Sequence, residues 1–256
     1  MKQTRTYPGI YTRRPALKTR LLATVTLLTL CLHVPKILLA ATSGDKHYSM
    51  AGFFDIHVCN WPGRPLFFMP LFSTAGYDDI RQIDILYPDN RLLTRLDLSS
   101  YLTISKKDRP DKRVFIKQLD IPTDAGDGWY AASITLTDGK VHRAHDYVII
   151  SKLARAGGQV PGDNQELPSP PEKLSWQAVS GAAFYQVFIR DQWDNDNLVY
   201  TSALLVEPEL ALPENLIEPG GLHTWTIHAR DTNEDLMLGD FNHGSMSKPA
   251  AFSVRQ

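Results

Sequence analysis

Alternating apolar residues in the stretch 174–191, LSWQAVSGAAFYQVFIRD, place the strongest limit on what this chain can fold into. The apolar side chains recur at every second position in two segments: Leu174, Trp176 and Ala178, then Tyr185, Val187 and Ile189. Ser180-Gly181 interrupts the pattern between them. A period of two, with aromatic and β-branched residues around a small-residue turn, predicts two half-buried antiparallel strands.

Runs of the same kind follow, at 198–201, 209–212, 222–230 and 250–254, and Pro, Gly and Asn separate them. Short strands at this spacing are typical of a β-sandwich. We therefore predict one sandwich domain over residues 167–256.

This domain resembles a bacterial fibronectin type III-like domain. The residues that carry the resemblance are Trp176, Gly181, Ala182, Tyr185, Val187, Leu216 and Pro219-Gly220. His223 departs from it, since the family usually has a corner tyrosine after the Pro-Gly pair. The resemblance covers about a third of the chain, and it implies a spacer or binding module that rarely catalyses a reaction.

Residues 45–152 also have the pattern of a β domain, which we interpret as an immunoglobulin-like sandwich. Strands are predicted at 53–58, 66–72, 80–87 and 114–119, and a hairpin at 129–150. Asp138-Gly139 at its centre predicts a two-residue turn that pairs Leu136 with Val141 and Tyr130 with Tyr147. The fold class is therefore all-β, with two tandem β-sandwich domains.

Residues 153–166 are rich in Gly and Pro and predict a linker between the domains. The charge changes across it. Residues 45–152 carry 14 basic and 14 acidic side chains, whereas residues 167–256 carry 5 basic and 12 acidic ones.

Residues 1–41 have the layout of an export signal: seven basic residues and no acidic one, an apolar run from 21 to 32, and Ala40-Ala41 at the end. Arg13-Arg14 fits the twin-arginine route, while the Leu-rich run fits the general secretory route. Residues 21–41 are also long enough for an uncleaved membrane anchor. We expect an exported protein, periplasmic or extracellular.

Removal of residues 1–41 would leave 20 basic side chains against 28 acidic ones, a net charge of −8. Nucleic acids and anionic lipid surfaces attract basic patches, so neither is an expected partner. Cys59 is then the one remaining cysteine and cannot form an intrachain disulfide.

Sequence motifs for catalysis are absent: there is no Gly-rich phosphate loop, nucleophile elbow or His-Glu-x-x-His zinc motif. We expect no enzyme activity and no cofactor. Asp191, Asp194 and Asp196 share one oxygen-rich loop, which leaves a weak calcium alternative, although the familiar calcium-hand spacing is missing.

Two surfaces of the second domain are candidate binding sites. Phe184 and Phe188 fall on the face of their strand opposite Tyr185, where an open sheet face would expose them. Trp193 lies in the acidic turn, where an indole suits stacking on a sugar or a protein.

Two further segments are candidates. The long loop 231–249 carries Met237, Phe241 and Met246, and long loops at sandwich ends often bind partners. Trp61 and Arg64, between Pro62 and Pro65, could form a rigid ligand platform. We expect a non-catalytic accessory protein of the cell envelope that engages a protein partner. A carbohydrate-binding protein is the alternative, and a hydrolase with an unmarked active site is a third reading.

Overall fold

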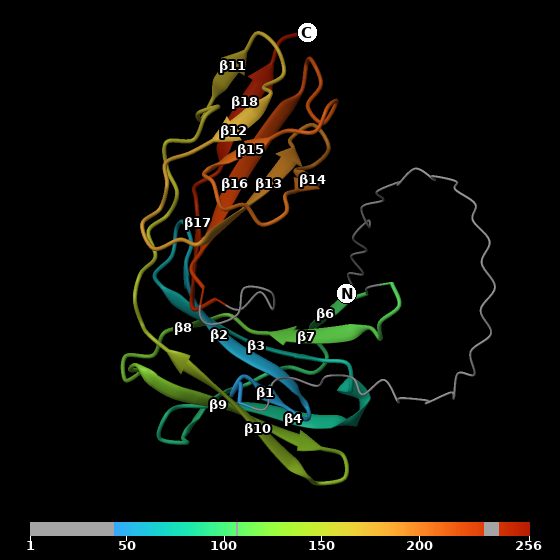
Figure 1. Cartoon of the computed structure of the whole chain (residues 1–256), viewed down its shortest axis with the longest axis vertical. Helices are drawn as coiled ribbons and strands as arrows, with labels where there is room; N and C mark the ends of the chain where they lie inside the picture. Colours follow the sequence, from blue (N-terminus) through green and yellow to red (C-terminus); the bar gives the residue numbers. More distant parts are fainter. Residues whose placement is uncertain (1–43, 106, 233–240) are drawn as a thin grey trace, which may run out of the picture.

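The computed structural model describes residues 44–105, 107–232 and 241–256, which form two tandem β-sandwiches (Figure 1). The export signal expected over 1–41 lies outside these residues. Within them, no helix has the length and apolar character needed to cross a membrane.

The first sandwich packs two sheets face to face. One sheet contains β1 (Tyr48–Ser49), β2 (Gly52–Asn60), β3 (Phe67–Thr74), β6 (Tyr101–Ile104), β7 (Lys112–Ile116) and β8 (Leu119–Asp120). The other has the order β10-β9-β4-β5, with β4 (Ile80–Leu86), β5 (Leu92–Arg95), β9 (Gly128–Leu136) and β10 (Val141–Val148). A short 3-10 helix, η1 (Tyr77–Asp79), leads into β4.

The alternation of each strand explains this first core. Phe54 and Ile56 of β2 face Tyr130 and Ile134 of β9 across one cluster of buried side chains. All four are fully buried. Because successive residues of a strand point to opposite faces, the apolar residues at alternate positions form the inner surface of each sheet.

The hairpin between β9 and β10 differs from its prediction by one residue. Val141 pairs with Thr135, and Tyr147 pairs with Trp129. The Leu136 amide donates to the Lys140 carbonyl at 2.8 Å, so the loop has three residues. Of its residues only Gly139 has a positive φ, of 85°. A three-residue loop that ends in a left-handed glycine is the next common solution after the two-residue turn, and the sequence Asp-Gly suits both.

The second sandwich contains the strands predicted from the alternation. They are β12 (Lys173–Ser175), β13 (Phe184–Asp191), β14 (Asn197–Thr201), β15 (Glu209–Ala211), β16 (Leu222–Arg230) and β18 (Ala250–Val254). β13 pairs with β14 and β16, β16 pairs with β18, and β12 pairs with β15 on the opposite side. Tyr185, Val187 and Ile189 face the core, as predicted.

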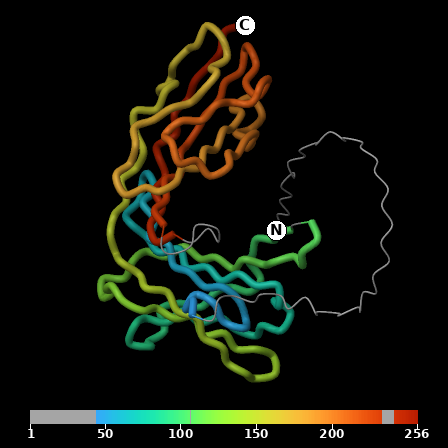
Figure 2. The backbone as a smooth tube through the Cα atoms, viewed as in Figure 1, coloured from blue at the N-terminus to red at the C-terminus, as the bar shows by residue number. Residues whose placement is uncertain are grey.

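Residues 153–166 pack along the second sandwich (Figure 2). Leu153 and Ala156 are buried in its core, and the Trp225 indole donates to the Pro161 carbonyl at 3.2 Å. β11 (Gln165–Leu167) begins inside this segment and pairs in parallel with β18. The Gly and Pro residues therefore lie in a segment that runs along the core of the second sandwich.

β17 (His243–Met246) joins the two sandwiches into one continuous sheet. It pairs antiparallel with β16 and parallel with β2 of the first sandwich. The prediction of a long open loop over 231–249 is wrong for this part, because residues 243–246 are a strand between two others. Figure 1 shows β17 at the junction of the sandwiches.

Candidate functional site

A cleft of about 420 Å³ lies at the end of the second sandwich away from the first. Asp191 at the end of β13, Trp193 in the following turn and Glu218 to Gly221 before β16 form its walls, and His223 of β16 also lines it. The register places Asp191 opposite His223, so the pairing of β13 with β16 brings the two sides together.

Trp193 is both exposed and fixed in position. Its side chain is 72% exposed. Its backbone amide donates to Asp191 Oδ1 at 2.8 Å, and its indole Nε1 donates to the Gly220 carbonyl at 3.3 Å. Asn195 and Asp196 have left-handed φ angles of 52° and 58°, which asparagine and aspartate tolerate in tight turns. The indole therefore presents a preformed apolar surface to solvent.

His223 is buried beneath the cleft, with 5% of its surface exposed. Neither ring nitrogen has a hydrogen-bond partner of good geometry in the part of the chain that the structure describes. Burial lowers its pKa, against the opposing effects of the Asp191 carboxylate and of a weak hydrogen bond with the Arg190 backbone. A buried polar group without a well-formed hydrogen bond lowers the stability of the fold. Such groups often mark a place where a ligand or a water molecule supplies the missing hydrogen bond.

The carboxylates of the turn do not form the calcium site that we considered. Asp194 accepts from the Asn197 amide at 3.1 Å, and Asp196 accepts from Gln192 and Thr224. Across residues 44–105, 107–232 and 241–256, no group of three or more His, Cys, Asp or Glu side chains is placed to hold a metal ion. Asp194 and Asp196 instead shape the turn that carries Trp193.

The outer face of β13 is partly covered. Phe184 and Phe188 are half-buried, with Arg230 and Thr226 of β16 opposite them. Met246 of β17 is also half-buried, and it pairs with His228. Met237 lies outside the described residues. These residues lie closer to the first sandwich than the Trp193 cleft does, so the predicted binding residues are not brought into one site.

Phe241 is buried between the sandwiches, and the prediction that it lies on an exposed loop is wrong. It is 5% exposed. Its ring stacks on His57 of β2 with centroids 3.6 Å apart and meets His228 of β16 edge-on at 5.7 Å. The Phe241 side chain thus fills the junction that the parallel pairing of β17 with β2 creates.

The histidines around Phe241 are held neutral. Burial is the main cause that lowers the pKa of His57 well below its usual value, with further contributions from His228 and Arg230. Burial also lowers the pKa of His228 to about 3. Cys59, two residues after His57, is fully buried, and burial raises the pKa of its thiol to about 12. A thiol in this environment is not a nucleophile at neutral pH.

The predicted platform of Trp61 and Arg64 is a packed corner. Trp61 is half-buried, and its ring meets Phe67 edge-on at 5.1 Å. The Arg64 guanidinium lies 3.6 Å from the centre of the Phe67 ring and donates to Gln118 Oε1 at 2.8 Å. Arg64 is therefore engaged within the first sandwich, whereas the buried Trp61 Nε1 has no hydrogen-bond partner among the described residues.

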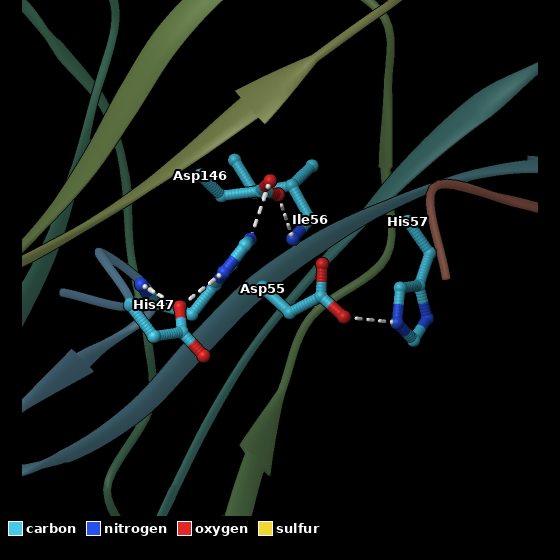
Figure 3. Close-up of polar contacts among 6 residues, drawn as sticks. His47, Asp55, Ile56, His57 and Asp146 are labelled. Atoms are coloured by element: carbon cyan, nitrogen blue, oxygen red, sulfur yellow. Dashed lines mark hydrogen bonds and ion pairs between the residues drawn. The ribbon is translucent and has the colours of Figure 1, made fainter. Parts of the chain in front are cut away.

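A buried carboxylate in the first sandwich orders the start of the described chain (Figure 3). Asp146 of β10 is fully buried. It accepts from the Ile56 amide at 2.8 Å and lies 3.1 Å from His47 Nε2, while His47 Nδ1 lies 2.8 Å from Asp45. Figure 3 also shows the separate pair of Asp55 and His57.

Replacement of Asp146 by asparagine should lower the free energy of unfolding by about 1–3 kcal/mol, because the amide turns one donor toward a buried donor. Urea denaturation would measure this loss. Asp138→Asn, in the exposed hairpin loop, is the matched control and should change stability little. Equal stability of the two variants would contradict a structural role for Asp146.

Ser151, His243 and Asp231 form a hydrogen-bonded series at the junction that no sequence motif marks. Ser151 Oγ lies 2.9 Å from His243 Nε2, and His243 Nδ1 bonds to Asp231 Oδ2. The same Nε2 lies 2.8 Å from the Ile149 carbonyl, an acceptor, so this nitrogen carries a proton. Burial opposes the charge on His243, but the hydrogen bond and charge of Asp231 prevail and raise its pKa.

A second exposed aromatic group was also missed by the sequence analysis. Trp129 and Tyr147 pair across β9 and β10 with rings 5.2 Å apart, and each is 42% exposed. Lys46 Nζ lies 3.8 Å from the centre of the Trp129 ring. Correct hairpin register would have placed the two rings together, whereas the predicted two-residue turn paired Tyr147 with Tyr130.

No family model matches the chain, and no curated protein matches its sequence. Three of the solved structures that show a distant likeness illustrate it. They are Escherichia coli alpha-2-macroglobulin activated by porcine elastase (13% identity, 80% of this chain and 20% of that chain, TM-score 0.26), domains A168–A170 of titin (11%, 76% and 61%, 0.27) and Salmonella alpha-2-macroglobulin reacted with methylamine (11%, 85% and 16%, 0.26). The chain spans less than two thirds of each, and TM-scores this low identify no family.

Proposed function

We propose that the protein is an exported, non-catalytic binding protein of the cell envelope, and that it engages a protein partner through the cleft at the end of its second sandwich. The observation that carries this proposal is Trp193, which is 72% exposed yet held by hydrogen bonds at both its amide and its indole. Preformed aromatic side chains of this kind often dominate binding energy at protein interfaces, because little entropy is lost when they are covered.

The rest of the proposal is supported by the sequence. The basic and then apolar N-terminal segment supports export, and a net charge of −8 after its removal disfavours nucleic acids and anionic lipids as partners. We further propose that the second sandwich is fibronectin type III-like. The inward Trp176 and Tyr185 support this, with ring centroids 5.3 Å apart.

Trp193→Ala should reduce partner binding at least tenfold, since loss of a central aromatic anchor typically costs about 2 kcal/mol or more. A photo-crosslinking residue at the exposed position 194, beside Trp193, would capture the partner from the envelope fraction, and titration with the identified partner would give the affinities of the native chain and the variant. Trp129→Ala is the matched control, because Trp129 is a partly exposed tryptophan on the other sandwich. Equal loss in both variants, or a glycan as the only captured ligand, would overturn the proposal, and the glycan result would favour the carbohydrate alternative.

A hydrolase is the second candidate, and the series Ser151, His243 and Asp231 favours it. The contact between His243 Nε2 and the Ile149 carbonyl weighs against it, because a protonated Nε2 cannot accept the serine proton. We expect a fluorophosphonate probe to leave Ser151 unlabelled at pH 7 to 8. Labelling that Ser151→Ala abolishes would establish a serine nucleophile and contradict our proposal.

A further inference from the structure

The cleft beside Trp193 offers many hydrogen-bond acceptors and a negative charge. Asp191 and Glu218 contribute carboxylates to its walls. The described basic side chains nearby pair elsewhere: Lys173 with Glu209, Arg190 with Asp196 and Arg255 with Glu166. The two carboxylates in the cleft therefore keep their charge available to a ligand.

An aromatic wall completes this arrangement. The Trp193 indole N–H is directed to the Gly220 carbonyl, which fixes the ring and leaves its face exposed. The face of an indole is the preferred aromatic surface for a cation, and carboxylates form the strongest hydrogen bonds with guanidinium groups.

His223 is the independent sign that a polar group belongs in this place. It lines the cleft, is 5% exposed, and has two ring nitrogens without a well-formed hydrogen bond among the described residues. Gly221 packs directly against the ring, because a Cβ at this position would lie 2.6 Å from His223 Nε2. One nitrogen of a neutral imidazole accepts a hydrogen bond, and a neutral ring does not repel a positive ligand. Burial lowers the pKa of His223, which keeps the ring neutral.

We infer that the cleft recognises an arginine side chain in a basic segment of the partner, with the guanidinium against Trp193, its N–H groups bonded to Asp191 and Glu218, and His223 beneath as a further acceptor. This inference rests on the proposed function and gives the partner a chemical class. The second sandwich, with 12 acidic side chains against 5 basic ones, would also attract such a segment over a longer range.

The test compares two synthetic peptides, Gly-Ser-Arg-Gly-Ser-Arg-Gly and the same peptide with citrulline at both arginine positions. Citrulline has nearly the same shape but no charge. Titration of the full exported chain, followed by intrinsic tryptophan fluorescence and by calorimetry, should show binding of the arginine peptide at least tenfold tighter than that of the citrulline peptide. Binding should also weaken as salt rises.

Variants then assign the contact. Asp191→Asn and Glu218→Gln keep the size of each side chain, and each should lower the affinity for the arginine peptide about fivefold or more. The Asp191→Asn side chain retains an oxygen that can accept from the Trp193 amide, so the turn should persist. Asp194→Asn is the matched control, since this carboxylate lies in the same turn but does not line the cleft. Gly221→Ala, which crowds His223, should also weaken binding.

The outcomes separate this inference from the proposed function. Equal affinity for the two peptides, binding of neither, or equal effects of Asp191→Asn and Asp194→Asn would overturn the arginine site. In that case Trp193-dependent capture of a protein partner would still support the proposed function. Partner capture that does not depend on Trp193 would overturn the proposed function, whatever the peptides show.

Discussion

The free energy of unfolding is expected to fall steeply below about pH 6.5, by about 1.4 kcal/mol per pH unit for each of His57 and His228. Both are buried at the junction, and burial lowers the pKa of each in the folded protein. As the pH falls, the unfolded chain therefore binds protons at these two histidines that the folded chain does not bind. The stability that these two residues contribute is fully present above their unfolded pKa of about 6.5 and is lost as the pH falls toward their folded values.

Urea unfolding at pH 8.0, 6.5, 5.5 and 4.5 would measure this slope. Other acidic and basic groups contribute to it, so the informative comparison is with His57→Gln and His228→Gln. Each variant should reduce the slope between pH 4.5 and 6 by about one proton, even where its stability at pH 8 is lower. An unchanged slope in both variants would show that neither histidine is neutral in the folded protein.

His243 has the opposite pH dependence. Its pKa is raised in the folded protein, because the bond to Asp231 outweighs burial. The stability it contributes is fully present below its unfolded pKa and is lost as the pH rises through the folded value. The three histidines together therefore favour a stability maximum close to neutral pH.

Phe241→Ala should lower the free energy of unfolding by about 3–5 kcal/mol, the usual cost of deleting a buried phenylalanine. The loss would expose the stacked ring of His57 and the edge of His228 to an unfilled space. Because Phe241 lies between the two sandwiches, the variant should also split unfolding into two transitions by calorimetry, while the wild-type protein unfolds in one.

Phe184→Ala is the matched control for this prediction. Phe184 is half-buried on the outer face of β13. Its replacement should lower the free energy of unfolding by clearly less, and unfolding should still occur in one transition. If Phe241→Ala unfolds at the same urea concentration as Phe184→Ala, the ring does not hold the sandwiches together.

Much of the fold follows from local alternation. Trp176, Tyr185 and Trp225 lie on the faces that a period of two assigns to them, and β16 and β18 have the predicted bounds. Local patterns decide which side of a strand is buried, because each strand of a sandwich has one apolar face. They do not decide a hairpin register when Asp-Gly fits loops of two and three residues.

The junction could not be predicted in the same way. Residues 243–246, His-Gly-Ser-Met, have no apolar alternation, and the pairing partner in β2 is far away in the sequence. The burial of both faces of β2 is related to this junction, since His57 stacks on Phe241 from the second half of the chain. For the candidate cleft, Trp193 was found from its place in the acidic turn, whereas the role of His223 required knowledge of the side chains around it.

The parallel pairing of β17 with β2 has a mechanical consequence. If the N-terminal end is held at the envelope and the Trp193 end holds a partner, a pull between them loads two connections at once. One is the covalent segment 153–166, and the other is the pairing of residues 243–245 of β17 with β2. Parallel strands pulled along their length share the load among several hydrogen bonds in shear, so this pairing should resist separation of the two sandwiches under tension.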